Sequence, residues 1–405
     1  MKQTLQYLAR GVSKYARRAL LRSRQYRHWL AAERKTRKLS REQLRAEQWS
    51  KVKDVLEYAY RRVPLYTERF RGAGLTPDDV KKPEDLRRLP LLTKDDIRRN
   101  FPDRLVDTER QVRPERLGQT SGSTAASMHY LRPEEAWRRD LYYTIMLRAG
   151  GMWTVPLFVL ATPHCTAATC SIREDREKDG VWISKAQKVP WLRPLDTMIG
   201  LPSSERILGA PDEYMENLRQ IVTGHAPAII VADPVYLAAF ARYLRRSHAP
   251  VPELECIIST YELLTGSVRD LLDEVFGCEV YTVYWGSEIL NVANECEHHT
   301  LHVNPDNVWL EVLHDGRPAR PGEVGRAVLT DLGNYNMPFI RYDIGDAVER
   351  GDGTCACGKK TDTMVAVHGR TCDVIQTHNG DRTLTPLPAA GPIARGGLRS
   401  PPRTP

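Results

Sequence analysis

The sequence predicts an α/β protein whose mixed sheets are flanked by helices and preceded by a helical region. Four short apolar runs alternate with stretches of helical periodicity, a pattern typical of a parallel sheet covered on both faces. Helical spacing of apolar residues dominates the first hundred positions, and a hairpin pattern follows residue 300. The four apolar runs are 157–161, 228–231, 255–259 and 280–284.

Length and composition narrow the class of protein. The chain has 405 residues, which favours more than one domain, because about 100–200 residues per domain is usual. Its residues are 41% hydrophobic and 27% charged, as in ordinary soluble proteins. The sequence contains neither an apolar run long enough to span a membrane nor a signal-peptide core. We therefore interpret its eight cysteines as reduced thiols or metal ligands of a cytoplasmic protein.

Positive charge gathers in the first fifty residues, which hold 14 Lys or Arg and 3 Asp or Glu. This arm carries a net charge of +11 and the whole chain +8, so residues 51–405 sum to −3. A solvated helical face explains the arm, because it lacks the Trp- and Phe-rich side of a membrane-surface helix. Contact between the arm and an anionic membrane surface is the alternative. We expect no nucleic acid partner.

Cap signals place the N-terminal helices. Ser40 and Gln43 make a capping-box pair, so a helix is predicted to begin there. Apolar residues recur at helical spacing over 52–63 and predict one buried face, and Pro64 should end the helix.

Two further helix starts follow in the same region. Thr76, Pro77 and Asp79 combine an N-cap, a first-turn proline and an early acidic residue. Thr93 with Asp96 predicts another start.

Further helices and strands are predicted after residue 230. Helices are expected at 235–244 and 267–275, between the apolar runs. Strands at 308–313 and 325–330 should form an antiparallel hairpin, joined by a long loop that contains Asp315-Gly316.

A hydroxyl-rich segment is the first candidate for chemistry. Hydroxyl and backbone N–H groups donate to anionic oxygens, and glycine lets the backbone approach a phosphate closely. The segment lacks the Gly-Lys-Ser/Thr ending of a Walker loop, and clusters of this composition are mostly plain loops. Its residues are Thr120, Ser121, Gly122, Ser123 and Thr124.

Three later segments carry side chains suited to a nucleotide. Tyr284 and Glu288 follow the fourth apolar run, where an aromatic ring can stack on a base and a carboxylate can hold Mg²⁺. Asp346 follows a glycine turn, and its carboxylate can accept hydrogen bonds from ribose hydroxyls. Arg370 has the guanidinium fork that suits phosphate or ribose oxygens. Taken singly, each segment has the plainer interpretation of a strand end, a turn or a surface loop.

A cysteine and histidine constellation predicts a metal site. Cys355 and Cys357 can place two thiolates on one ion, and Cys296 and His302 can complete a tetrahedral zinc site. Such a site would be structural, because protein ligands fill all four positions. Buried cysteine that packs as a small hydrophobe is the plainer interpretation, and the histidines at 298–299 are rival ligands.

Together, the four nucleotide segments resemble, in order and spacing, the adenylate-forming (acyl-CoA synthetase-like) superfamily. More closely, the chain is similar to the phenylacetate–CoA ligase family, which includes members labelled CapK. Further likeness lies at 57–66, at 89–94 and at 295–302, and the resemblance covers roughly 50–385. It implies the fold of an adenylate-forming ligase N-terminal domain, with a truncated C-terminal domain after it.

The resemblance also implies a reaction and its residues. A carboxylate would attack the α-phosphorus of ATP to give an acyl-adenylate and pyrophosphate, and a thiol, usually coenzyme A, would then displace AMP. Thr120, Glu288 and Arg370 would be the catalytic residues. Ser121 to Thr124 would wrap the phosphates, Tyr284 would stack on adenine beside Gly286 and Ser287, Glu288 would bind Mg²⁺, Asp346 would hold the ribose, and Arg370 would contact the nucleotide near the hinge.

Three departures from the family pattern bear on activity. The hydroxyl segment normally continues with glycine, a basic residue and proline, whereas residues 125–127 are Ala-Ala-Ser, which removes one cation for pyrophosphate. Cys372 stands where the superfamily often has aspartate at the domain hinge. The family-like sequence stops near Pro386, before the position of the superfamily's adenylation lysine, so the C-terminal domain is expected to be truncated.

Two functional hypotheses follow. The first is an ATP-dependent acid–thiol ligase that uses a small carboxylic acid and coenzyme A or another thiol, in polysaccharide or secondary metabolism, and that could be a homodimer. The second is a catalytically impaired or non-catalytic nucleotide-binding homologue. The predicted organisation is a basic helical region at 1–100, an AMP-binding core at 101–368, a hinge with the start of the truncated domain at 369–386, and a disordered tail at 387–405.

Overall fold

A computed structural model gives the arrangement of most of the chain. The mixed α/β class that the sequence predicts is confirmed. The basic arm before residue 34 and the tail at 387–405 lie outside the described part. The residues described are 34–107, 109, 117–120, 128–131, 157–160, 177–178, 181–185, 197–200, 207–225, 229–289, 291–371, 374–376 and 382–384.

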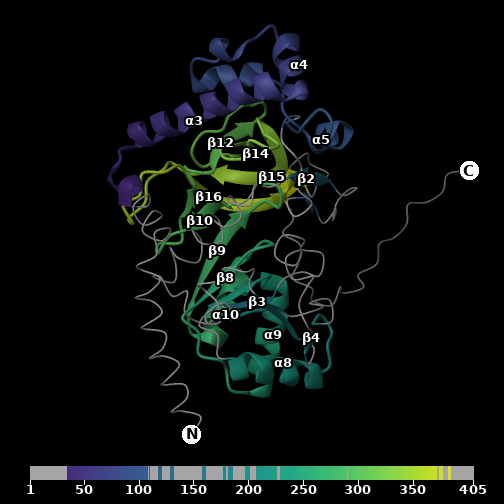
Figure 1. Cartoon of the computed structure of the whole chain (residues 1–405). Helices are drawn as coiled ribbons and strands as arrows, with labels where there is room; N and C mark the ends of the chain where they lie inside the picture. The colour runs from purple at the N-terminus through teal and green to yellow at the C-terminus, as the bar shows by residue number, and fades with distance from the viewer. Residues whose placement is uncertain are drawn as a thin grey trace, which may run out of the picture.

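One sheet of 14 strands runs through the described molecule, and the strand β9 (Glu279–Trp285) joins its two halves. Figure 1 shows one half in green and yellow under the N-terminal helices and the other in teal beside a second set of helices. On one side β9 pairs parallel with β8, and on the other it pairs antiparallel with β10. The strand order is β13-β12-β14-β15-β16-β11-β10-β9-β8-β7-β3-β6-β5-β4.

The parallel half is the part predicted from apolar runs separated by helices. β3, β6, β7, β8 and β9 run parallel, and β5 and β4 close the edge antiparallel. Helices α8, α9 and α10 pack on the strands to form one hydrophobic core. The bounds are β3 Leu157–Leu160, β4 Glu177–Lys178, β5 Val181–Lys185, β6 Thr197–Gly200, β7 Ile229–Ala232, β8 Cys256–Ser259, α8 Asp212–His225, α9 Pro234–Ser247 and α10 Gly266–Phe276.

The antiparallel half contains the predicted hairpin of β12 and β14. The link between them is not a plain loop, because a short strand, β13, pairs back on β12 through a two-residue turn. Asp315 and Gly316 adopt φ angles of 47° and 79° there, as the primed hairpin turns require. The bounds are β10 Asn291–Glu295, β11 Leu301–Val303, β12 Val308–His314, β13 Arg317–Pro318, β14 Val324–Asp331, β15 Tyr342–Arg350 and β16 Thr363–Arg370.

The N-terminal helices begin where their caps predict. Ser40 caps α3 with a full capping box, and Thr93 caps α5 in the same way. Pro64 does end α3, but it also opens α4 as its first residue. The start predicted at Thr76 gives only a three-residue 3₁₀ helix. The bounds are α3 Arg41–Arg62, α4 Pro64–Gly72, α5 Lys94–Asn100 and the 3₁₀ helices Pro77–Asp79 and Pro83–Arg88.

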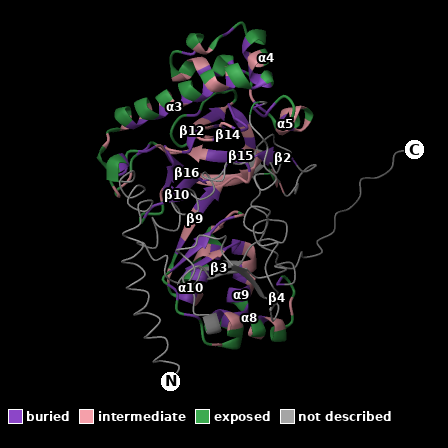
Figure 2. Ribbon diagram, in the orientation of Figure 1, coloured by how far each residue is buried: buried purple, intermediate pink, exposed green. Residues whose placement is uncertain are grey.

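These helices share a hydrophobic core with the antiparallel strands. The predicted buried face at 52–63 is confirmed, since Val52, Val55 and Ala59 are fully buried against that core. Figure 2 shows the buried residues along the strands and the exposed ones on the outer faces of α3 and α8. The division at residue 100 stays a prediction. Within the described residues, no helix combines the length and apolarity that crossing a bilayer requires.

Two small hairpins complete the described elements. β1 (Leu117–Gln119) pairs antiparallel with β2 (His129–Leu131), and β17 (Val374–Gln376) pairs with β18 (Arg382–Leu384). The first hairpin packs on the antiparallel half, because Met128 and Tyr130 belong to the same core as the N-terminal helices.

Candidate nucleotide site and metal centre

Three of the predicted nucleotide residues meet where β9, β15 and β16 lie near one another. The backbone register of β15 and β16 sets Asp346 opposite Arg370. The Tyr284 hydroxyl donates to Asp346 Oδ2 at 2.7 Å, and Arg370 Nη1 lies 3.0 Å from Asp346 Oδ1. Residues 62 and 24 positions apart from Asp346 in the sequence therefore converge on one carboxylate.

Glu288 is held beside this group by Tyr342. The carboxylate of Glu288 follows β9, is 5% exposed, and accepts a hydrogen bond from the Tyr342 hydroxyl. The turn that carries it needs Gly286, whose N–H donates to the Ile289 carbonyl at 2.8 Å. A Cβ on Gly286 would come within 2.8 Å of that same oxygen, so a side chain would break the turn. Ser287 lies in this turn as well.

Two further residues belong to the cluster although the sequence analysis gave them no role. Tyr342 lies inside the segment that ends at Asp346, and Lys94 begins α5. Leu92 forms a parallel bridge with Tyr342, and its N–H donates to the Arg341 carbonyl at 2.9 Å, which brings α5 to the site. The ammonium of Lys94 then lies near Gly345 and favours the charged form of Asp346. The sequence could have pointed to both residues, because Lys94 lies in the family-like segment 89–94 and Tyr342 lies in the segment that ends at Asp346.

The electrostatics of the cluster follow from its burial. Burial raises the pKa of Asp346, and the positive charges of Arg370 and Lys94 and the hydrogen bond from Tyr284 oppose that rise. Burial, together with the neighbouring carboxylates, also keeps the pKa of Tyr284 and of Tyr342 well above the ordinary value, so both phenols stay protonated donors. For Arg370 burial would lower the pKa, but Asp346 and Glu288 outweigh it and raise the pKa.

Thr120 closes the loop that carries the other predicted phosphate ligands. Its N–H donates to the Met128 carbonyl at 2.9 Å, and its Oγ1 accepts from the Met128 N–H at 3.0 Å. The loop begins and ends next to the antiparallel half, where Asn334 Nδ2 donates to the Leu131 carbonyl at 2.9 Å. Ser121, Gly122, Ser123 and Thr124, the departure at 125–127 and Cys372 lie outside the described residues, so their roles stay predictions.

The predicted cysteine and histidine quartet is brought together. One ligand atom each from Cys296, His302, Cys355 and Cys357 lies within 4.8 Å of the others, and this arrangement can hold a metal ion. Cys296 Sγ is 3.4 Å from Cys355 Sγ, and Cys357 Sγ is 3.3 Å from His302 Nε2. Cys355 and Cys357 lie between β15 and β16, at the end of β16 opposite Arg370.

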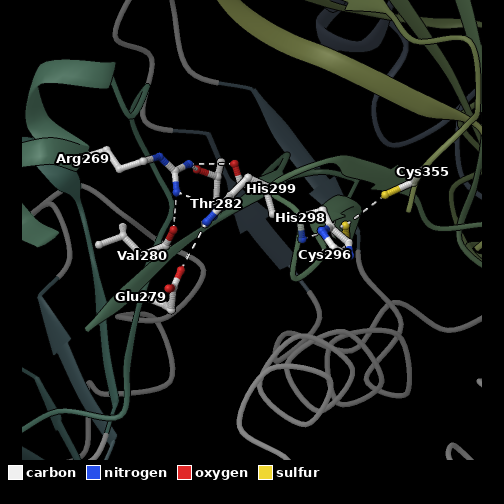
Figure 3. A network of polar contacts seen from close by, with 9 residues as sticks. Arg269, Glu279, Val280, Thr282, Cys296, His298, His299 and Cys355 are labelled. Atoms are coloured by element: carbon white, nitrogen blue, oxygen red, sulfur yellow. Dashed lines mark hydrogen bonds and ion pairs between the residues drawn. The ribbon is translucent and has the colours of Figure 1, made fainter. Parts of the chain in front are cut away.

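A polar network adjoins the quartet and connects it to helix α10 (Figure 3). Arg269 of α10 forms an ion pair with Glu295 at 2.7 Å, and the second carboxylate oxygen of Glu295 accepts from the Thr282 N–H at 2.8 Å. His299 lies against Arg269 and Glu295 through its Nδ1 and stacks on the Tyr281 ring. Glu295 directly precedes Cys296, so the network ties the quartet to both halves of the sheet.

Comparison with known proteins adds sequence relatives. A phenylacetate–coenzyme A ligase of Thermus thermophilus is 27% identical over 350 residues, which are 83% of this chain and 72% of that protein. The phenylacetate–coenzyme A ligase of Escherichia coli is 25% identical over 345 residues, or 82% and 72% of the two chains. Protein CapK of Staphylococcus aureus is 23% identical over 310 residues, or 74% and 61%. No protein-family model matches the chain.

Solved structures agree on the fold. The 2-hydroxyisobutyryl-CoA ligase in its postadenylation state, in complex with 2-HIB-AMP, superposes with a TM-score of 0.63 at 20% identity, over 84% of this chain and 70% of that one. The same ligase in an open conformation with 2-HIB-AMP and CoA gives a TM-score of 0.60 over 84% and 77%. The chain is therefore a sequence relative of the phenylacetate–coenzyme A ligases and CapK, and it has the fold of an adenylate-forming coenzyme A ligase.

Proposed function

We propose that this chain activates a small carboxylic acid with ATP as an acyl-adenylate and transfers the acyl group to the thiol of coenzyme A. The observation that carries the proposal is the convergence of Tyr284, Glu288, Asp346 and Arg370 on one buried cluster, in a chain whose sequence relatives are coenzyme A ligases. Sequence position alone would allow these side chains to face different surfaces. Their contacts support a common binding site.

Three of these side chains keep hydrogen-bonding or metal-binding positions available for the proposed roles. A carboxylate offers about four acceptor positions, and Asp346 uses two of them on Tyr284 and Arg370, so ribose hydroxyls can occupy the others. Glu288 accepts one hydrogen bond, from Tyr342, and its remaining oxygen suits Mg²⁺, a hard ion that prefers carboxylates. The Arg370 guanidinium is 39% exposed, which leaves part of its donor fork open to a nucleotide.

The proposed catalytic contribution of the protein is positioning. Glu288, through Mg²⁺, and Arg370 would offset the negative charge that gathers on the phosphates as the acid attacks. Thr120 and the loop at 121–124 would donate to the phosphate oxygens, and Tyr284 would stack on adenine through its ring while its hydroxyl holds Asp346. The cofactors of the reaction would be ATP, Mg²⁺ and coenzyme A, in the cytoplasm. The zinc predicted for the cysteine and histidine quartet would be a structural ion outside this reaction.

A second candidate function rests on the hydroxyl segment. Residues 125–127 are Ala-Ala-Ser, so the cation that this loop would offer to pyrophosphate is missing. Such a chain would bind ATP yet turn it over poorly. Calorimetric titration with ATP, set beside an exchange assay on the same preparation, separates the two functions, because binding without exchange favours the impaired homologue.

The main test is acid-dependent exchange of labelled pyrophosphate into ATP, with a panel of aryl and aliphatic acids. At least one acid should support exchange, and Glu288→Gln should lower that exchange about 100-fold or more, because the neutral amide is a poor Mg²⁺ ligand. Glu349→Gln is the matched control, since Glu349 lies on β15 and contacts His368 instead of the cluster. Equal exchange by wild type and Glu288→Gln would refute the proposal.

A further inference from the structure

The four cysteine and histidine ligands are brought together by local turns. Gly358 has a φ of 80°, which favours glycine, and its N–H donates to the Cys355 carbonyl at 3.1 Å. This tight turn directs the thiols of Cys355 and Cys357 to one place. A second turn follows β10, where the Cys296 N–H donates to the Thr300 carbonyl at 2.9 Å and so sets Cys296 close to β11.

The distances suit a tetrahedral ion. Around zinc, with Zn–S near 2.3 Å and Zn–N near 2.0–2.1 Å, two sulfurs lie about 3.8 Å apart and a sulfur and a nitrogen about 3.6 Å apart. The observed Cys296–Cys355 separation of 3.4 Å and the Cys357–His302 separation of 3.3 Å are slightly shorter, and the full set lies within 4.8 Å. Changes of at most about 1 Å in these separations would place all four atoms around one ion.

The surroundings orient two of the ligands and keep them away from water. Thr361 Oγ1 lies 3.0 Å from His302 Nδ1, and with a proton on Nδ1 the Nε2 atom, which faces Cys357, is left as the donor to a metal. The His298 N–H donates to Cys296 Sγ at 3.4 Å, a contact that helps to orient the sulfur. Cys296 and His302 are 1% and 5% exposed, so water would compete little for these positions.

The rival histidines are placed elsewhere. His299 lies against Arg269, Glu295 and Tyr281, and His298 is exposed and approaches Cys296 through its backbone (Figure 3). Three sulfurs and one imidazole are the donor set that favours zinc over hard cations such as Mg²⁺. Because four protein ligands fill a tetrahedron, such a centre is structural.

We propose that Cys296, His302, Cys355 and Cys357 form a closed zinc centre that clamps the β10–β11 turn to the connection between β15 and β16. In the register of the sheet, His302 lies opposite Thr363, the first residue of β16. The zinc therefore joins four strands, β10, β11, β15 and β16, and it lies at the end of β16 opposite Arg370. The clamp is independent of the ligase proposal, and its readouts do not require ligase activity.

The first experiment is metal analysis of the full chain purified without chelators from zinc-supplemented cells. We expect about one zinc per chain by inductively coupled plasma mass spectrometry. The Cys355→Ser/Cys357→Ser double variant should lose the zinc. His298→Ala and Cys278→Ser are the matched controls and should retain it, since neither side chain belongs to the quartet. Soluble, folded wild-type protein with no zinc would overturn the proposal.

The second experiment keeps the proposal testable if the double variant does not fold. Wild-type protein reconstituted with Co²⁺ should show the strong visible absorption of tetrahedral cobalt and the near-ultraviolet bands of sulfur–cobalt charge transfer. Addition of zinc should abolish both, and removal of zinc should lower the thermal midpoint by several degrees. A spectrum of six-coordinate cobalt, or a mass 2 Da lower from a Cys296–Cys355 disulfide in metal-free native protein, would contradict a zinc clamp.

Discussion

Each half of the sheet contains a buried aspartate, and the two aspartates differ in their partners. In the antiparallel half, both oxygens of Asp346 have partners, Tyr284 and Arg370. In the parallel half, Asp233 follows β7 and caps α9, with Oδ1 accepting from the Val235 N–H at 2.9 Å. Its other oxygen, Oδ2, is buried without a hydrogen-bond partner in the part of the chain that the structure describes.

The comparison shows which neighbours favour the charged form of a buried carboxylate. Burial raises the pKa of Asp233 to about 7, with a smaller contribution from the nearby Glu262 charge, and among the described residues only the backbone N–H groups of Val235 and Tyr236 oppose the rise. Burial also raises the pKa of Asp346, and the charges of Arg370 and Lys94 and the hydrogen bond from Tyr284 limit that rise without cancelling it. A cation and donors beside the carboxylate thus distinguish a candidate nucleotide ligand from a helix cap.

The largest effect expected concerns Glu311, a carboxylate of intermediate burial that is paired with an arginine as Asp346 is. Arg341 Nε and Nη2 each lie 3.0 Å from a Glu311 oxygen, and the two side chains are 5% and 12% exposed. Arg341→Ala should lower the free energy of unfolding by about 3–5 kcal/mol, because it leaves a buried charge unpaired. Urea denaturation measures this change. A loss below about 1 kcal/mol would show that pairing matters little in this half.

Asp233 should make stability depend on pH, because burial raises its pKa in the folded state to about 7. Its folded pKa of about 7 lies above the ordinary 3.8, so between pH 4 and 7 the folded state keeps a proton that the unfolded state releases. Its contribution to stability is full below pH 4 and falls as pH rises to 7. Asp233→Asn should remove a slope of up to about 1.4 kcal/mol per pH unit.

Urea midpoints at pH 4.5, 5.5 and 6.5 measure the Asp233 effect as the difference between wild type and Asp233→Asn. Asp306→Asn is the control, because Asp306 is a partly exposed acid that pairs with Lys51. If the difference between wild type and Asp233→Asn stays constant across the three pH values, Asp233 does not hold the extra proton.

A smaller effect is expected from the Asp346 pair itself. Arg370 is 39% exposed, so solvent screens the interaction and Arg370→Ala should cost only about 1–2 kcal/mol of unfolding free energy. Arg326→Ala is the control, since the Arg326–Asp343 pair is 51% and 15% exposed and should contribute less than about 1 kcal/mol. Equal losses in the two variants would mean that Asp346 needs no cation for stability.

The smallest expected effects come from helix caps, one in each half. Ser40→Ala removes a complete capping box from α3 and should cost about 1 kcal/mol. Thr265→Ala removes a longer contact, 3.4 Å from the Val268 N–H to Oγ1, at the start of α10, and should cost about 0.5 kcal/mol. The fall in thermal midpoint relative to wild type measures the two losses of stability. A larger loss at Thr265 would reverse the order that the geometry predicts.

Local signals in the sequence were enough to predict many elements but not their partners. The caps at Ser40 and Thr93 and the strands β3, β7, β8 and β9 follow from side chains adjacent in the sequence, so pattern alone placed them, whereas β4, β5 and β6 were not predicted. β10 was missed, because its asparagines look like loop residues. In the structure they are buried, and their side-chain amides hydrogen-bond to each other. Asn291 Nδ2 donates to Asn294 Oδ1 at 3.1 Å.

The candidate site shows the same limit. Tyr284, Asp346 and Arg370 could be selected from the sequence because family-like segments carry them. The role of Tyr342 could not, because its hydroxyl meets Glu288 across 54 positions of sequence. Such a contact depends on how β9 and β15 sit in the sheet, and no local periodicity encodes that pairing. The metal quartet was predictable because thiol and imidazole chemistry restricts the combinations that can share an ion.

The core shared by the N-terminal helices and the later strands has a consequence for synthesis on the ribosome. Gln48 Nε2 donates to the Val308 carbonyl at 3.1 Å, and the Tyr66 hydroxyl donates to the Pro338 carbonyl at 2.6 Å, across 260 and 272 positions. At about 5–20 residues per second, translation would leave the apolar side of α3 without its native partner for about 10–50 s. During that interval the nascent chain would present a target for chaperones.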